Sequence, residues 1–352
     1  MTGSRSLLAR GAMLAALILA VSAQVVCDAA AAGRPRPKVE IKIATLAPEG
    51  STWMRLMEQL DAEVRDSTAS EVGFRFYPGG VQGDEAVVLR KIRLGQLHGG
   101  GFTGVGLGEI APDLRVMEVP FFFRTTEEVR AVQERMGPVF EQELRGAGFE
   151  LLGWSDVGFV YLFTKSPIRS TEDLRKVRMW LWEGDPLAEA FLKTLGVSPV
   201  PLPITDVVTS LQTGLIDAVY TSTLACIALQ WFTRVSHMTD LPVTHAQGAV
   251  VVSRQAFEQI SPAAQATVKR LARKYFDRLA IATTKDNETS AQVLAEKGIK
   301  VVALTDAEKA GFEEIGRVVR EKLAATLYQR EILDRTMKAL EEARTAAGAA
   351  GR

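Results

Sequence analysis

An arginine and two tryptophans at alternate positions are the residues of this chain whose types and spacing best suit ligand recognition. Arg178, Trp180 and Trp182 occur in an extended run that stops at a turn, and a helix is expected to begin at Pro186. Alternation along a strand puts the three side chains on one face. The end of a strand just before a helix is where open α/β sheets hold ligands. Both a ligand site and a packed core fit this pattern.

Few other residues have the arrangement that catalysis or metal binding needs. His98, His237 and His245 are scattered and, with one cysteine in the mature chain, do not make a zinc site. No G-x-S-x-G motif is present for an exported hydrolase. Glu183 and Asp185 could form an acid pair, but capping and solvation explain them more simply. We therefore expect a binding protein with no catalytic residues, metal or cofactor.

A glycine-rich stretch over residues 99–108 contains a match to G-x-G-x-x-G at Gly99, Gly101 and Gly104. As a dinucleotide motif it is weak, because Pro112 interrupts the following helix and no acidic residue ends a second strand at the expected distance. We interpret the stretch as a loop whose glycines let the backbone approach something closely or leave room beside it.

Length and composition indicate a globular protein of about two domains. The chain has 352 residues with 42 basic and 42 acidic side chains, and 47% of its residues are hydrophobic. Balanced charge argues against a nucleic-acid-binding protein, which usually has a basic excess.

The N-terminus has the pattern of a cleaved secretory signal. Arg5 and Arg10 precede an apolar run over residues 11–26, and small residues at 29–32 offer a cleavage site. The alternative, a membrane anchor, needs a longer apolar run. Cys27 could be a lipoprotein cysteine, but the residues before it make a poor lipobox and cleavage after residue 32 would remove it. We expect a periplasmic protein that starts near Gly33, without an intrachain disulfide.

Alternating strands and helices predict an α/β fold with parallel strands. Strands are expected over residues 38–44, 72–77, 150–154, 158–164, 177–182, 200–202, 217–220, 248–253 and 300–304. Helices are expected over residues 51–67, 84–94, 126–147, 171–174, 186–195, 205–213, 221–231 and most of 306–344. Residues 262–298 have no internal proline and could form one bent helix that crosses both domains.

Several stretches, in order and almost without gaps, resemble one family over roughly residues 39–338. They are IKIATLAPEGSTW, FYPGGVQGDEAVVLRKIRLGQL, VPFFF, KSPIRSTEDLRKVRMW, LGVSPVPLPITDVVTSLQTGLIDAVYTST and GAVVVSRQAFEQISPAAQ. The chain resembles the extracytoplasmic solute receptors of tripartite ATP-independent periplasmic (TRAP) transporters, the DctP family. The resemblance implies a periplasmic-binding-protein-like α/β fold, with two lobes around a cleft and a long helix spanning both.

The resemblance also implies lobe boundaries and partners. Lobe I would comprise residues 36–157 with 246–285, and lobe II residues 158–245 with 286–345, after a signal peptide over 1–32. Such receptors close on a small molecule and deliver it to a small and a large membrane subunit. We expect a monomer that binds no nucleic acid.

The chain departs from the family at the position that binds the ligand. Most members hold an organic acid with an arginine in a DLKGLKIR motif, and DLRKVRMW aligns Trp180 with it. A second basic residue often stands where Val160 aligns, and a polar pair becomes Tyr220 and Thr221. One branch of the family lacks the arginine, works with a tetratricopeptide-repeat accessory protein and has hydrophobic ligands proposed for it. This chain is similar to that branch.

These departures predict a cleft for an apolar or amphipathic ligand, since an indole offers an apolar face and one donor. The expected ligand-binding residues are Leu46, Phe102, Thr103, Phe159, Val160, Tyr161, Arg178, Trp180, Trp182, Tyr220 and Thr221. Three alternatives stay open: the tryptophans pack a core, Tyr220 is an ordinary strand residue, or Arg178 replaces the lost arginine and holds an organic acid. A lipid-shuttling or sensing protein on the same scaffold is a further possibility.

Overall fold

The first lobe is built on a five-stranded mixed sheet. The computed structural model describes residues 35–324 and 326–350, so the signal segment expected over residues 1–32 lies outside the described residues. The strand order is β2 (Val72–Tyr77), β1 (Val39–Thr45), β3 (Gly99–Thr103), β11 (Gly248–Ser253) and β4 (Phe149–Trp154). β1 runs parallel to β2 and β3, whereas β11 runs antiparallel to β3 and β4. β11 is almost wholly apolar and buried, as expected for a strand covered on both faces, whereas β1 also carries Glu40 and Lys42.

The second lobe has a smaller sheet centred on β5 (Gly158–Thr164). β5 is antiparallel to β8 (Ala218–Ser222), β10 (Thr244–Ala246) and β9 (His237–Thr239), and β9 pairs in parallel with β12 (Lys300–Val302). A separate parallel pair, β6 (Trp180–Trp182) and β7 (Val200–Leu202), lies beside β8 through a bridge between Met179 and Ala218. The tryptophan strand of the sequence is thus part of the second lobe.

Helices surround these sheets. They are α2 (Thr52–Ser67), α3 (Glu85–Arg93), α4 (Gly104–Ile110), α5 (Thr126–Gly146), α6 (Thr171–Leu174), α7 (Pro186–Thr194), α8 (Val207–Thr213), α9 (Thr223–Ala228), α10 (Arg254–Phe257), α12 (Asp306–Leu323) and α13 (Arg330–Ala350). Three short 3-10 helices are η1 (Pro112–Glu118), η2 (Ile204–Asp206) and η3 (Trp231–Thr233). None of the helices in the described part of the chain is long and apolar enough to cross a membrane.

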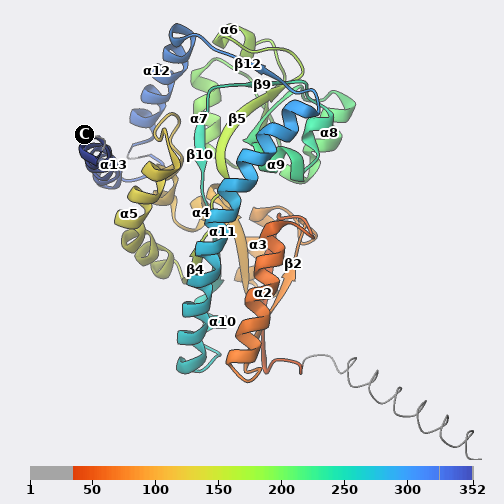
Figure 1. Ribbon diagram of the computed structural model, residues 1–352, viewed down its shortest axis with the longest axis vertical. Coiled ribbons are helices and arrows are strands. Elements are labelled where there is room, and N and C mark those ends of the chain that lie inside the picture. The colour runs from red at the N-terminus through yellow and green to blue at the C-terminus, as the bar shows by residue number, and fades with distance from the viewer. Residues whose placement is uncertain (1–34, 325, 351–352) are drawn as a thin grey trace, which may run out of the picture. The chain divides into compact units, whose positions relative to one another are not determined.

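One long helix, α11 (Pro262–Glu296), connects the two lobes. Ser261 caps its first turn, and the helix runs beside α2 and β4 of the first lobe and then beside α9 and β5 of the second (Figure 1). Leu271 and Phe276 are buried in the core of the first lobe, and Leu294 is buried in that of the second. The helix predicted over residues 262–298 is therefore confirmed, as is the mixed α/β class with two lobes.

Most expected elements form within a few residues of their predicted ends, and the differences have local causes. Residues 99–108 are not a loop but β3 and α4, because the glycines let this strand and helix pack closely on their neighbours. The strand expected over residues 177–182 is only β6, since the Val177 N–H closes a turn with the Leu174 carbonyl. The short strands β9 and β10 were not predicted, because three residues carry too little periodicity.

Candidate ligand-binding cavity

A cavity of about 630 Å³ lies between the two lobes. The first lobe contributes the end of β1, the start of α2, β3 and η1, and the second contributes β5, β6, β8, α7 and α9. The long helix α11 adds Thr283 and Asp286. A volume of this size is typical of sites for small molecules, which bury most of the ligand surface.

Aromatic side chains form one wall of the cavity around Trp180. The ring of Trp180 stacks on Tyr220 with centroids 4.9 Å apart, meets the edge of Trp231 at 5.2 Å, and lies 5.8 Å from Trp182. Its Nε1 donates to the Leu202 carbonyl at 3.0 Å, and the side chain is only 1% exposed. Trp180 is thus at the same time a cavity-lining residue and the centre of a packed cluster.

The two neighbours of Trp180 are fixed by hydrogen bonds. The Tyr220 hydroxyl accepts from the backbone N–H of Trp182 at 3.0 Å, and burial raises the pKa of this phenol, so it stays protonated. The Trp182 indole donates to Asp84 at 3.0 Å, and the N–H of Ile204 donates to the same carboxylate oxygen at 3.2 Å. Asp84 caps α3 of the first lobe, so these bonds join the two lobes next to the cavity wall.

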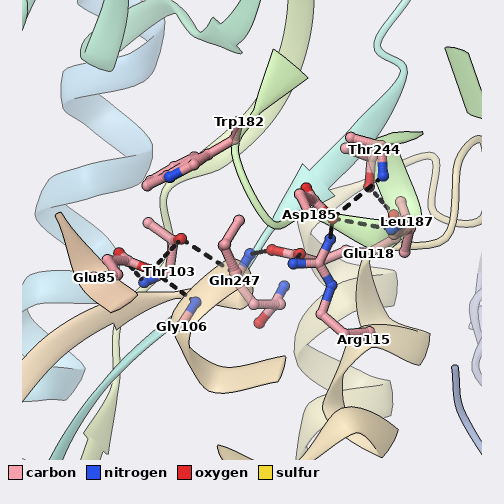
Figure 2. Close-up of polar contacts among 12 residues, drawn as sticks. Glu85, Thr103, Gly106, Arg115, Glu118, Trp182, Asp185, Leu187, Thr244 and Gln247 are labelled. Carbon is pink, nitrogen blue, oxygen red and sulfur yellow. Dashed lines mark hydrogen bonds and ion pairs between the residues drawn. The ribbon is translucent and has the colours of Figure 1, made fainter. Parts of the chain in front are cut away.

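A buried ionic cluster of Arg115, Glu118 and Asp185 lies in the cavity wall (Figure 2). Arg115 contacts Asp185 at 2.8 Å and Glu118 at 3.4 Å, and its side chain is 2% exposed. Asp185 also caps α7 by accepting from the N–H groups of Leu187 and Ala188. Burial raises the pKa of Glu118, although Arg115 acts against the shift. The guanidinium is therefore already paired with two of the protein's own carboxylates.

Glu85 is the first residue of α3, and its side chain reaches the start of α4. Its carboxylate accepts from the N–H of Thr103 at 2.7 Å, the hydroxyl of Thr103 at 3.0 Å and the N–H of Gly106 at 2.7 Å (Figure 2). Burial raises the pKa of Glu85 to about 8, and the hydrogen bonds to Thr103 and Gly106 only partly offset it. Backbone donors that could receive an anionic ligand are thus taken by a side chain of the protein.

Most of the ligand-binding residues expected from the sequence come together in this cavity. Its lining includes Leu46, Phe102, Thr103, Val160, Trp180, Trp182, Tyr220 and Thr221.

Three expected residues do not line the cavity. Phe159 and Tyr161 flank Val160 in β5 and point to the opposite face, where Phe159 meets the edge of His245 at 4.8 Å and Tyr161 packs against the core of the second lobe. Arg178 precedes β6, its side chain is 58% exposed, and it forms a bidentate pair with Asp217 at 2.7 and 2.9 Å. The structure therefore does not bring Arg178 to the position of the lost arginine.

The ionic residues of the cavity were missed by the sequence analysis. Arg115 and Glu118 follow Pro112 in a stretch without periodicity, and Glu85 reads as an ordinary first-turn residue of α3. Asp185 was assigned as a helix cap, which is confirmed, but its ion pair with Arg115 spans 70 residues of sequence. The only signal for this cluster was that its charged residues stand next to apolar runs: Arg115 and Glu118 precede VPFFF, and Asp185 follows the tryptophan strand.

The fold and the cavity define a class of protein, the two-lobed solute-binding proteins. Solved structures agree: a TRAP periplasmic solute-binding protein from Xanthobacter autotrophicus with bound β-D-galacturonate has a TM-score of 0.80 at 19% identity, covering 86% of this chain and 99% of that chain. Another from Ralstonia eutropha, with bound (S)-2-acetolactate, has a TM-score of 0.80 at 21% identity over 86% of this chain and 99% of that one.

Sequence relatives narrow the class to one family. The model of the bacterial extracellular solute-binding protein family 7, DctP, matches residues 43–326, and the chain belongs to this family. The ectoine/5-hydroxyectoine-binding periplasmic protein UehA of Ruegeria pomeroyi is 23% identical over 79% of this chain and 87% of its own length. The C4-dicarboxylate-binding periplasmic protein DctP of Rhodobacter capsulatus is 21% identical over 73% and 78%. The chain is thus a TRAP-type extracytoplasmic solute receptor, not an enzyme.

Proposed function

We propose that this receptor binds a neutral apolar or amphipathic solute rather than a simple dicarboxylate. One observation carries the proposal: the anion-binding groups at the cavity already hold carboxylates of the protein. Arg115 is paired with Asp185 and Glu118, the first turn of α7 is capped by Asp185, and the N–H groups of Thr103 and Gly106 hold Glu85.

An anionic ligand would therefore find Arg115 already paired and the N–H groups of Thr103 and Gly106 already hydrogen-bonded. A buried carboxylate without a free cation costs several kcal/mol. Burial also raises the pKa of Asp156 in the cavity wall, and nearby Arg130 only partly offsets it, which is typical of a poorly solvated site. Arg55, the other arginine of the lining, lies at the exposed rim and donates to Thr52 at 2.8 Å.

An apolar ligand would gain from the same cavity. Phe102, Val160 and Trp182 are buried side chains in its lining, and each Å² of apolar ligand surface removed from water contributes roughly 25 cal/mol. The hydrogen of the Tyr220 hydroxyl, which accepts from Trp182, can be donated to one neutral acceptor on the ligand.

The solutes named for several relatives differ in charge from the solute proposed for this chain. The solutes named for them include a C4-dicarboxylate, a galacturonate and an acetolactate, which are organic acids. In this chain Trp180 aligns with the arginine that holds the ligand carboxylate in most family members. The same family fold would thus serve a different chemical class of solute.

We further propose where the receptor works and which proteins it works with. After export to the periplasm and removal of residues 1–32, a monomer would close its lobes on the solute and deliver it to small and large TRAP membrane subunits, with a tetratricopeptide-repeat protein as accessory partner. The lobes would be bounded near residues 157, 245 and 285, which is supported by the course of β4, β5, β10 and α11 between the two sheets. A lipid-shuttling protein without import would have the same cavity but no membrane subunits.

Native mass spectrometry of the protein purified without added ligand tests the solute class. We expect a neutral, apolar co-purified molecule, and in calorimetry we expect binding of n-alkanols but not of succinate. Micromolar binding of succinate, with no alkanol bound, would refute the proposal. Trp180→Leu removes the indole without burying a charge and should weaken alkanol binding at least tenfold, and unaltered binding in a variant that circular dichroism shows to be folded would remove Trp180 from the site.

A further inference from the structure

We infer that the inner end of the cavity is a subsite for one hydrocarbon chain of the ligand, an inference that rests on the proposed function and specifies the solute further. This inner chamber is lined by Pro120, Leu162, Ala188, Phe191, Leu192 and Val243. It is continuous with the part of the cavity that holds Trp180 and Tyr220.

The six residues of the chamber are buried, whereas the cavity also reaches an exposed rim. The rim is formed by exposed residues of the loop after β1, among them Glu49 and Gly50. Leu192 lies seven residues beyond Asp185 in α7, which corresponds to about 10 Å along the helix axis. Arg115 and Glu118 contact Asp185, so the ionic cluster lies at the N-terminal end of α7, about two turns from Leu192.

The apolar side chains of the chamber favour a hydrocarbon part of the ligand over a polar one. All six side chains are apolar, they come from α7, β5 and the segments around Pro120 and Val243, and they are buried, from 2% exposed at Leu192 to 8% at Ala188. A hydroxyl or amide placed among them would lose its hydrogen bonds with water and find no side-chain partner. A methylene chain loses nothing and removes apolar surface from water.

The ionic cluster does not oppose such a chain. Arg115 pairs with both carboxylates, Glu118 also accepts from the N–H of Gln247, and Asp185 accepts from the N–H groups of Leu187 and Ala188, so an apolar chain passing the cluster breaks none of these contacts. The polar end of the ligand stays on the outer side, where Tyr220 and Thr221 line the same cavity. The solute class is therefore a neutral amphiphile with one chain and a small head group.

A series of n-alkanols from hexanol to dodecanol tests the chamber by calorimetry. We expect the affinity to rise about fourfold with each methylene until the chain fills the chamber and to level off afterwards. Ala188→Phe fills part of the chamber and should shift this levelling to shorter chains, with at least a tenfold loss for the longest alkanol. Ala190→Phe is the matched control, because Ala190 lies in the same helix, is half-buried and does not line the cavity.

The binding results distinguish a failure of the chamber from a failure of the proposed function. If alkanols bind and the two phenylalanine variants behave alike, the chamber is refuted while the proposed function stands. If no alkanol binds and succinate does, the proposed function itself fails. Ala188→Val, paired with Ala190→Val, repeats the comparison with a smaller side chain in case Ala188→Phe does not fold, and equal chain-length profiles in the folded valine pair would overturn the inference.

Discussion

Trp182 and Asp84 are hydrogen-bonded between the two lobes, with 3.0 Å between the indole Nε1 and the carboxylate. Trp182 belongs to strand β6 of the second lobe, and Asp84 caps helix α3 of the first. The same carboxylate accepts from the N–H of Ile204. The opposite lobe therefore holds a side chain that lines the cavity. The position of Trp182 in the cavity wall thus depends on the lobes being closed.

Asp84→Ala should favour the open state and weaken ligand binding. The substitution removes the hydrogen bonds that Trp182 and Ile204 donate to Asp84 from the other lobe. Hydrogen bonds to a charged group contribute about 1.5–3 kcal/mol each. Because the binding-competent state is then less populated, we expect the dissociation constant to rise roughly tenfold or more. Small-angle X-ray scattering should show a larger radius of gyration.

Two further variants separate closure from helix capping. Asp84→Ser keeps a good N-cap for α3 but is too short to reach Trp182, so it should open the lobes without destabilising the helix. Asp206→Ala removes an exposed carboxylate two residues from Ile204 and should leave scattering and affinity unchanged. A closed, tightly binding Asp84→Ser protein would contradict the role given to Asp84.

Arg115→Met should strongly destabilise the protein. The change leaves Asp185 and Glu118 buried without their cation, and removing one partner of a buried pair costs about 3–5 kcal/mol. Urea denaturation measures the loss. The triple variant Arg115→Met/Glu118→Gln/Asp185→Asn should recover part of it, and equal stability of the single and triple variants would show that the carboxylates are not the cause.

Glu85 should make the protein less stable as the pH rises from about 5 to about 8. Burial raises the pKa of the folded-state carboxyl from 4.5 to about 8, so in this window the native state holds a proton that the unfolded chain has released. Stability then falls with rising pH, by at most about 1.4 kcal/mol per unit. Urea denaturation at several pH values should show a flatter profile for Glu85→Gln. Parallel profiles would mean that Glu85 titrates normally.

Gly104→Ala and Gly311→Ala should have opposite effects on stability. A Cβ on Gly104 would overlap the Glu118 carboxylate, which we expect to cost about 1–3 kcal/mol. A Cβ on Gly311, inside α12, would meet no atom within 4 Å and should stabilise the helix by about 0.5–1 kcal/mol. Calorimetric melting temperatures measure both. A neutral Gly104→Ala would mean that Glu118 moves freely aside.

The prediction from sequence succeeded where the signal was local. The pattern of residues 262–298 predicted α11, capping was recognised at Asp185, and alternation placed Trp180 and Trp182 on the face that lines the cavity. It failed where two faces of one strand were equally apolar: Phe159 and Tyr161 could not be distinguished from Val160 by hydrophobicity.

The sequence by itself determined the α/β class, the family and the aromatic character of the cavity wall, because each rests on residue types and short-range spacing. Only the tertiary structure decided which charges meet. It pairs Arg178 with Asp217, 39 residues away, and Arg115 with Asp185, 70 residues away. Such pairs depend on how strands and helices pack, which no local pattern specifies. Burial requires a partner for Arg115, whereas Arg178 is exposed and meets Asp217 only because the chain brings the two together.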